Sequence, residues 1–381
     1  MMAKPVRRKR FSVLQAGKID NIFLSLVLII LTIGLVMLFS ASYAFSYAQY
    51  GNSYKFIMRQ GAFGVIGVGV MLAVSKIDYH IWRKFAWIIY GISMLMLVIL
   101  LILPPMLKGK DVKRWLVIGP INFQPSEIAK FAVILLFSSL IAANYKQMKR
   151  IGFLAFLIGI LGITCVLVVF EPHLSATVLI FSIGIVLMIV GGLQMRWIAL
   201  GGLGGLGAGA LLIVSGVINY GSDRLKYWRD PWLDPVGKGF QTIQSLLAIG
   251  SGGIMGRGIG QSRQKYLWLP EPHNDFIFAI VCEELGLVGA MVVVLLFALL
   301  VWRGFTIAMR APDKFGSLLA IGLTFQVGLQ AMLNIFVVTN TIPNTGISLP
   351  FFSYGGTSLV LLLAEMGIVL SVSRGSNIDK S

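Results

Sequence analysis

Long apolar runs alternate with short polar intervals along nearly the whole chain. Each run has about the 20 residues that an α-helix needs to cross the hydrocarbon core of a bilayer. The pattern predicts about ten membrane-spanning helices, at 22–42, 58–76, 84–104, 126–144, 151–170, 173–191, 196–219, 276–303, 316–340 and 355–373. Only Glu171 and Pro172 separate the fifth and sixth runs, which predicts a tight return between them.

Composition narrows the fold class. The chain is 57% hydrophobic and 12% charged, whereas soluble domains average about 25% charged residues. A lipid-facing backbone must satisfy its own hydrogen bonds, and the ten-residue alternating segments of a membrane barrel are missing from the sequence. We therefore predict an all-α polytopic membrane protein.

Basic residues orient these spans. The chain carries 32 Lys and Arg against 15 Asp and Glu, a net charge of +17. They fill the N-terminal segment 1–21 and the short loops on the same side of the predicted membrane, as expected for cytoplasmic loops. The pattern predicts two cytoplasmic tails, 1–21 and 374–381, around one transmembrane domain, 22–373. The large extracytoplasmic loop, 220–275, lies between the seventh and eighth spans.

Two predicted outside loops depart from this rule. Their basic residues are Lys108, Lys110, Lys113 and Arg114 in loop 105–125, and Arg224, Lys226, Arg229, Lys238, Arg257, Arg263 and Lys265 in loop 220–275. Cations kept on the outer side suggest an anionic partner there. Attraction to anionic lipid headgroups is the alternative explanation.

Asp275 stands where a polar, proline-broken segment meets the eighth apolar run, beside Glu271, His273 and Asn274. A carboxylate at the edge of a membrane helix is a candidate for acid–base chemistry, because carboxylates are scarce in this chain. The same residues also suit a helix start, with Asn274 or Asp275 capping the free amides. Spacing alone does not separate the two interpretations.

Further ionisable residues fall inside the spans, where charges are costly and usually functional. Glu127 and Lys130 are three residues apart, so they share a helix face and can pair. The pair either binds substrate phosphate, with Glu127 orienting Lys130, or neutralises itself as a structural element. Glu283, Glu284 and Glu365 receive no role from the sequence.

Neither a metal site nor a nucleotide site is evident from motifs. No ligand cluster has diagnostic spacing, although a divalent cation such as Mg²⁺ or Mn²⁺ is compatible with the chemistry below. The Gly-rich segment 250–260 lacks the strand and the spacing of a nucleotide fingerprint. Its backbone amides suit either a phosphate cradle or a plain turn.

Several segments together resemble the SEDS family (shape, elongation, division and sporulation), whose members include FtsW, RodA and SpoVE. The matching segments are Arg114-Trp115, Gln124-Pro-Ser-Glu127 with Lys130, Gln244-Ser-Leu246, Leu269-Pro-Glu271, His273-Asn-Asp275-Phe-Ile-Phe278, Glu283-Glu-Leu-Gly286 and 343–358. They recur in family order across nearly the whole chain. Gly17-Lys-Ile-Asp20 and Asp230-Pro-Trp232 look more like the division protein FtsW, or its sporulation relative SpoVE, than like RodA.

The resemblance implies a peptidoglycan glycosyltransferase that polymerises lipid II in the bacterial cell membrane, at the division septum. It implies a class B penicillin-binding protein as partner, and it maps the family's essential aspartate onto Asp275. One position departs from the family pattern: His173 stands where an aspartate is usual. That departure weakens any acidic role there and strengthens the case for Asp275.

The implied reaction needs a base for the acceptor hydroxyl and cations for the diphosphate that leaves. We expect Asp275 to be the base and undecaprenyl diphosphate to leave with inversion. The expected substrate-binding residues are Arg114, Glu127, Lys130, Arg224, Lys265, Glu271 and His273. Membrane lipids, but no nucleic acid, are expected as further partners. Two other functions fit many spans and a lipid substrate: a lipid II flippase, and a non-catalytic scaffold for a transpeptidase.

Overall fold

A computed structural model describes residues 17–103, 114–118, 121–171, 173–194, 197 and 225–375. The predicted seventh span, Arg224, Lys108, Lys110 and Lys113 lie outside these residues. The helices and strands, in chain order, are α1 (Asn21–Tyr50), α2 (Lys55–Ser75), α3 (His80–Ile102), β1 (Leu116–Ile118), β2 (Ile121–Phe123), α4 (Pro125–Ala143), η1 (Tyr145–Lys149), α5 (Ile151–Phe170), α6 (Leu174–Val190), η2 (Pro231–Leu233), α9 (Phe240–Gly252), α10 (Ile277–Met309), α11 (Lys314–Val338) and α12 (Gly356–Gly375).

The helical prediction is confirmed wherever the structure describes the chain. Each of the nine predicted spans in these residues corresponds to one helix, although α1 and α10 run on to Tyr50 and Met309. Among the described helices, eight are long and apolar enough to cross a membrane, and α6 is a shorter apolar helix. The protein is a multi-pass membrane protein.

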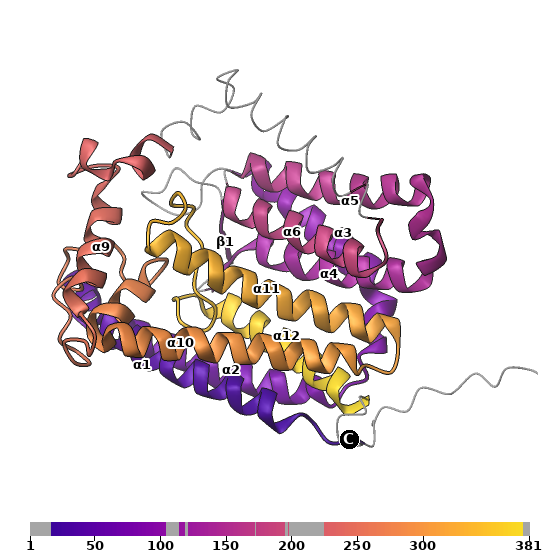
Figure 1. Cartoon of the computed structure of the whole chain (residues 1–381), viewed down its shortest axis with the longest axis horizontal. Helices are drawn as coiled ribbons and strands as arrows, with labels where there is room; N and C mark the ends of the chain where they lie inside the picture. Colours follow the sequence, from indigo (N-terminus) through magenta and orange to yellow (C-terminus); the bar gives the residue numbers. More distant parts are fainter. Residues whose placement is uncertain are drawn as a thin grey trace, which may run out of the picture.

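The helices form two groups joined by α11 (Figure 1). Helices α3, α4, α5 and α6 pack together on one side, and α1, α2, α10 and α12 on the other, while α11 contacts α4, α6, α10 and α12. The contact between α2 and α12 is close: a Cβ on Gly67 would lie 2.5 Å from Leu363, and one on Gly367 would lie 2.5 Å from the Met71 carbonyl oxygen. Small residues allow two membrane helices to approach in this way.

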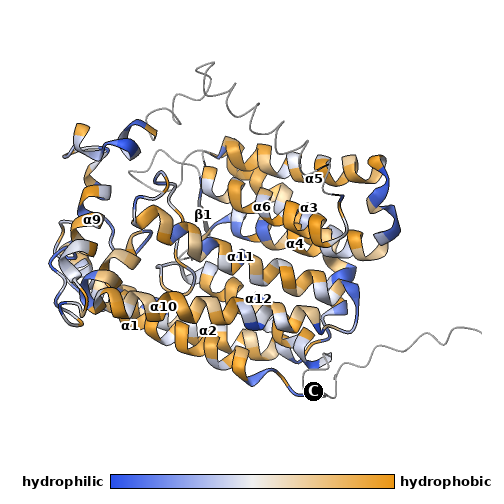
Figure 2. Ribbon diagram, in the orientation of Figure 1, coloured by the Kyte–Doolittle hydropathy of each residue, from blue (hydrophilic) through white to orange (hydrophobic). Residues whose placement is uncertain are grey.

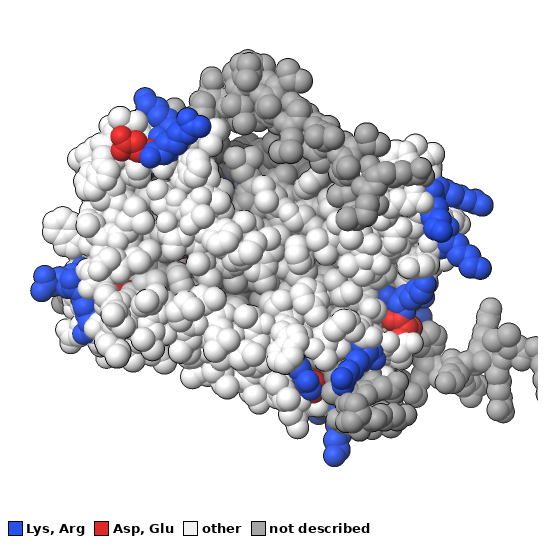
Figure 3. Space-filling model, viewed as in Figure 1, with Lys and Arg blue, Asp and Glu red and all other residues white. Residues whose placement is uncertain are grey.

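Outward-facing surfaces are apolar over the middle of the molecule and charged at its ends. Apolar residues colour most of each long helix (Figure 2), and on the face shown in Figure 3 the Lys, Arg, Asp and Glu side chains gather at the two ends of the long axis. An uncharged band between two charged ends is what a lipid-facing protein requires.

The described ends of the chain meet at one end of the bundle. The Asp20 amide donates to Ser373 Oγ (3.0 Å), and Arg374 Nε donates to the Gly17 carbonyl (3.0 Å). Asp20 also pairs with Arg303 of α10 (2.8 Å). The first and last spans therefore run in opposite directions, which agrees with the prediction of two tails on the same side.

One small element was not predicted. Strands β1 and β2 pair antiparallel within the loop before α4, with Leu116 opposite Phe123. The hairpin is attached to α12, because Thr357 Oγ1 donates to the Asn122 carbonyl (2.8 Å). It places Arg114 and Trp115 beside the cavity described next.

Candidate active site

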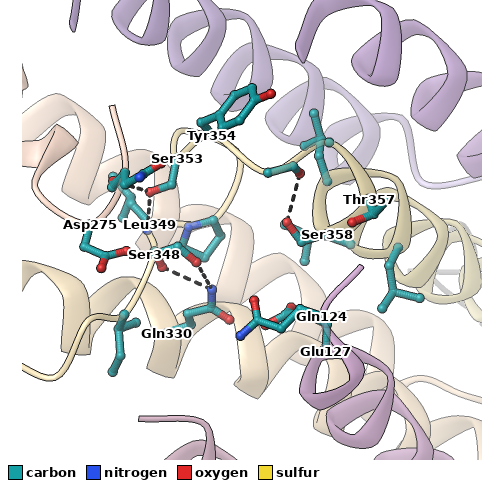
Figure 4. A pocket seen from close by; sticks show the side chains of 18 of the residues that line it. Gln124, Glu127, Asp275, Gln330, Ser348, Leu349, Ser353, Tyr354, Thr357 and Ser358 are labelled. Carbon is teal, nitrogen blue, oxygen red and sulfur yellow. Dashed lines mark hydrogen bonds between the residues drawn. The ribbon is translucent and has the colours of Figure 1, made fainter. Parts of the chain in front are cut away.

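A cavity of about 500 Å³ opens at the end of the bundle opposite the described ends of the chain. Its walls come from the last turn of α1, the first turns of α2, α4, α6 and α12, strand β2, the segment 271–275 and the segment 346–355. We call segment 346–355 the wall loop. It runs between Asp275 and the start of α12 (Figure 4). Most of the lining lies at the outer end on the predicted topology, and only Gln326, Gln330 and Glu365 reach deeper into the bundle.

Asp275 lies half-buried in this cavity, close to the wall loop (Figure 4). Its backbone carbonyl accepts a hydrogen bond from Asn334 Nδ2 (2.7 Å). A Cβ on Gly346 would lie 3.3 Å from Asp275 Oδ2, and Gly346 has φ +70. Glycine is required at 346 because the backbone is left-handed there and the carboxylate lies against it.

The helix-cap interpretation of this segment is wrong. Helix α10 begins after Phe276, and no side chain caps it. Asn274 instead donates from Nδ2 to Glu271 Oε2 (2.9 Å). Asp275 therefore precedes the N-cap residue Phe276 and lines the cavity from the chain that leads into α10.

Glu127 and Lys130 form the predicted pair, with Lys130 Nζ 2.9 Å from Glu127 Oε1. Both line the cavity. Pro125, in the first turn of α4, sets the start of the helix that carries them. Lys130 is 1% exposed and also donates to Gln330 Oε1 (2.9 Å). Since an ammonium group has three N–H donors, these two bonds leave one for an oxygen of a ligand.

Two histidines contribute in different ways. His273 is buried between aromatic rings, with centroid distances of 4.8 Å to Phe45 and 4.4 Å to Phe56. His173 Nδ1 lies 3.2 Å from Ser126 Oγ, at the position where the family resemblance leads one to expect an aspartate. Both rings line the cavity, and their partners fix them in place.

Arg114 and Glu271 also line the cavity, whereas Lys265 does not. Lys265 is buried, and its Nζ lies 3.0 Å from Glu284 Oε1 and 3.1 Å from Ser40 Oγ. The structure thus corrects the prediction for Lys265: its charge is compensated inside the protein. Arg224 lies outside the described residues.

Glu283 and Glu284, which had no predicted role, hold the predicted extracytoplasmic loop against α10. The Arg263 amide donates to Glu283 Oε1 (2.9 Å), and the Ser262 amide donates to Glu284 Oε1 (3.2 Å). The Gly-rich segment 250–260 docks on the same helix, because the amides of Arg257 and Gly258 donate to the carbonyls of these glutamates. These two bonds make it a docked turn rather than a free one, and a phosphate cradle there stays a prediction.

Three lining residues were missed as site candidates. Arg59 lines the cavity from the start of the second span, at the predicted outer side. A basic residue there breaks the positive-inside rule, and this departure could have marked Arg59 as a site candidate. Gln330 and Glu365 are polar residues within predicted spans, and such residues usually face a polar interior. The sequence did not show whether these two side chains face the cavity or another part of the bundle.

Among the described residues, no group of three or more His, Cys, Asp and Glu side chains could hold a metal ion. Three of the acidic lining residues have side-chain partners: Glu271 with Asn274, Glu127 with Lys130, and Glu365 with Gln326. Whether a divalent cation such as Mg²⁺ or Mn²⁺ takes part stays a prediction, and no step below is routed through one.

The chain resembles known proteins over nearly its whole length. It is 40% identical over 359 residues to stage V sporulation protein E of Bacillus subtilis strain 168, covering 94% of this chain and 97% of that protein. It is 36% identical over 358 residues to a protein named probable peptidoglycan glycosyltransferase FtsW of Geobacter sp. strain M18, covering 93% and 96%.

Solved structures agree with the sequence relatives. One is a peptidoglycan synthase complex described as coordinating polymerization and crosslinking, with a TM-score of 0.75 at 29% identity over 93% of this chain and 98% of the other. Another is the rod shape determining protein RodA of Thermus thermophilus, with a TM-score of 0.70 at 27% identity over 94% and 98%. The FtsW/RodA/SpoVE family model, described as cell cycle protein, matches residues 20–378, and the chain belongs to this family.

Proposed function

We propose that this protein is a peptidoglycan glycosyltransferase that polymerises lipid II during septal cell-wall synthesis. One observation carries the proposal: a single cavity, at the predicted outer end of the bundle, gathers the half-buried carboxylate of Asp275 with Lys130, Arg59 and Arg114. That set matches a reaction that removes a proton from a hydroxyl and releases an anionic diphosphate. The relatives' names support the same activity.

The proposed reaction is one in-line displacement. The 4-hydroxyl oxygen of the acceptor N-acetylglucosamine forms a bond to C1 of the donor N-acetylmuramic acid, and the bond from C1 to the diphosphate oxygen breaks. Asp275 takes the hydroxyl proton, and undecaprenyl diphosphate leaves with the bonding electrons. A base in this role contributes typically 10²–10⁴-fold to the rate.

Three cations are available to the leaving group. Arg59 and Arg114 each present a planar fork of donors, which suits the oxygens of a diphosphate. Lys130 has one donor left after its bonds to Glu127 and Gln330, so it supplies one directed hydrogen bond. Glu127 holds the ammonium group in position for it.

We propose a class B penicillin-binding protein as partner and the division septum as the site of action. The similarity to a peptidoglycan synthase complex supports a partner that crosslinks what this chain polymerises. The multi-pass helical fold supports a place in the cell membrane.

The deciding experiment uses the purified full chain with its transpeptidase partner and labelled lipid II in detergent. Glycan polymer is the expected product. Because detergent micelles have no second compartment, a flippase leaves lipid II unchanged, and so does a scaffold. Polymer formation should be abolished by Asp275→Asn, while the size-exclusion profile and partner binding are retained. Normal glycan chains from Asp275→Asn would refute the assignment of the base.

A further inference from the structure

Two amide side chains on α11 connect the two chemical halves of the cavity. Gln330 and Asn334 are four residues apart, so they lie on one face of the helix, about 6 Å apart along its axis. Gln330 is 8% exposed and Asn334 is fully buried. A buried carboxamide is costly unless it is hydrogen-bonded, so the partners of these two residues show what they hold.

Asn334 holds Asp275. Its Nδ2 donates both to the Asp275 carbonyl (2.7 Å) and to the Ile347 carbonyl of the wall loop (2.6 Å). The Asn334 NH₂ group thus connects the Asp275 backbone to the wall loop, and the Asp275 carboxylate lies against this same loop. The wall loop is tied to the same segment a second time, because Ser353 Oγ donates to the Asn274 carbonyl (2.8 Å).

Gln330 holds Lys130. Its Oε1 accepts from Lys130 Nζ (2.9 Å), and its Nε2 donates to the Ser348 carbonyl (3.1 Å) and to Ser348 Oγ (3.2 Å). Ser348 follows Ile347 directly, so the two amides grip consecutive residues of the wall loop. Figure 4 shows the bonds from Gln330 to Ser348, with Asp275 on the other side of Ser348.

We propose that Gln330 and Asn334 are positioning residues that set the spacing between Asp275 and the diphosphate-binding Lys130. The inference rests on the proposed function. A helix face is a rigid support, and each amide connects the same short loop to one of the two residues: Asn334 to the Asp275 backbone, and Gln330 to the Lys130 ammonium group. Displacement in line needs the base and the leaving-group cation at opposite sides of one sugar, and errors of about 1 Å can cost about 10²-fold in rate.

The two residues predict different defects. Gln330→Met removes the acceptor for Lys130, and hydrogen bonds to charged groups are the strong ones. The Kd for undecaprenyl diphosphate should therefore rise about tenfold. Asn334→Leu leaves Lys130 untouched, so that Kd should stay within about twofold, whereas kcat for lipid II polymerisation should fall about 10²-fold.

A second variant at Gln330 separates positioning from packing. Gln330→Glu keeps an oxygen that can accept from Lys130 but loses the NH₂ group that donates to Ser348. Because its carboxylate adds a negative charge beside Lys130, the Kd for undecaprenyl diphosphate should rise, and turnover at saturating lipid II should also fall because Ser348 is no longer held. If Asn334→Leu does not fold in detergent, Asn334→Ser, which keeps a hydroxyl donor, takes its place.

Thr324→Val is the matched control. Thr324 lies on the same helix, is 2% exposed and packs against Gly304, away from the cavity lining. It should polymerise lipid II like the wild type. Thermal unfolding of every variant in detergent tests whether the losses merely follow stability.

The outcomes are distinct. Undecaprenyl diphosphate binding that weakens equally in Gln330→Met and Asn334→Leu would overturn the division of labour, and so would unchanged turnover in Asn334→Leu. A wild-type chain that forms no glycan with its partner would refute the proposed function, and the positioning role with it. If the wild type forms glycan and the Gln330 and Asn334 variants show unchanged turnover and binding, the positioning role alone would be refuted.

Discussion

Gly346 offers a direct test of how closely the wall loop approaches Asp275. Replacement by alanine adds a single methyl group 3.3 Å from Asp275 Oδ2. That distance is tighter than most Cβ contacts, so either the carboxylate or the loop must shift by a few tenths of an ångström. The substitution also forces an L residue into a left-handed backbone, since φ is +70.

The two costs can be separated with a second glycine. Gly51 ends α1 with φ +67, and a Cβ added there would have no atom within 4 Å. Gly51→Ala therefore carries the same backbone penalty, about 1–2 kcal/mol, without touching the site. Both variants should lose similar thermal stability, and the difference between their activities isolates the contact with Asp275.

Polymerisation of labelled lipid II, with the transpeptidase partner present, is the appropriate assay. A shift of a few tenths of an ångström at the base should lower kcat about tenfold in Gly346→Ala. Gly51→Ala should keep the wild-type rate at a temperature where both proteins are folded. Equal rates for the two variants would show that Asp275 does not depend on the wall loop, and the proposed geometry would be wrong.

Two further predictions concern stability. Burial raises the pKa of the Glu171 carboxyl to about 8, although the nearby Arg114 guanidinium opposes the shift. Between about pH 4.5 and 8 the folded state therefore holds a proton that the unfolded state has lost. The free energy of unfolding should then fall as pH rises through this range. Thermal unfolding in detergent between pH 5 and 9 should show this slope, Glu171→Gln should flatten it, and an unchanged slope in that variant would place its origin elsewhere. Lys265 and Glu284 form a buried pair, 3% and 0% exposed, so Lys265→Met alone should cost about 3–5 kcal/mol and Lys265→Met with Glu284→Leu should cost less. Limited proteolysis of the loop before α10 measures the effect, and a single variant as resistant as the double would contradict it.

The sequence predicted the helices well because one physical requirement dominates them. A span must be apolar and about 20 residues long, and nothing else in the chain imitates that signal. The hairpin β1–β2 lacked such a signal, since strands of three residues leave too short a pattern to read. Helices α1 and α10 have 30 and 33 residues, which is more than the about 20 that cross a bilayer, so hydropathy does not mark where they end.

The site was predicted where local spacing defines a contact and missed where the contact is long-range. Glu127 and Lys130 pair because i, i+3 residues share a helix face. Lys130 and Gln330 are 200 residues apart in sequence, and only the packing of α11 against α4 brings them together. Asn334 could be noted as a polar residue in a span, but its bond to the Asp275 carbonyl depends on how far α11 is rotated.

The basic residues on the predicted outer side show why a charge pattern alone overstates an anion site. Arg114 lines the cavity, and Arg59 joins it from α2. Lys265 is neutralised by Glu284, and Arg257 lies 3.8 Å from Glu283. The positive-inside rule thus fails here for two physical reasons: some cations face the cavity, and others fasten a long loop to α10 through buried carboxylates. Only the cations that face the cavity should respond to a diphosphate ligand. Arg257→Gln should therefore make the loop more sensitive to proteolysis and leave the affinity for undecaprenyl diphosphate unchanged. Arg59→Gln should weaken that affinity and leave the proteolysis of the loop unchanged.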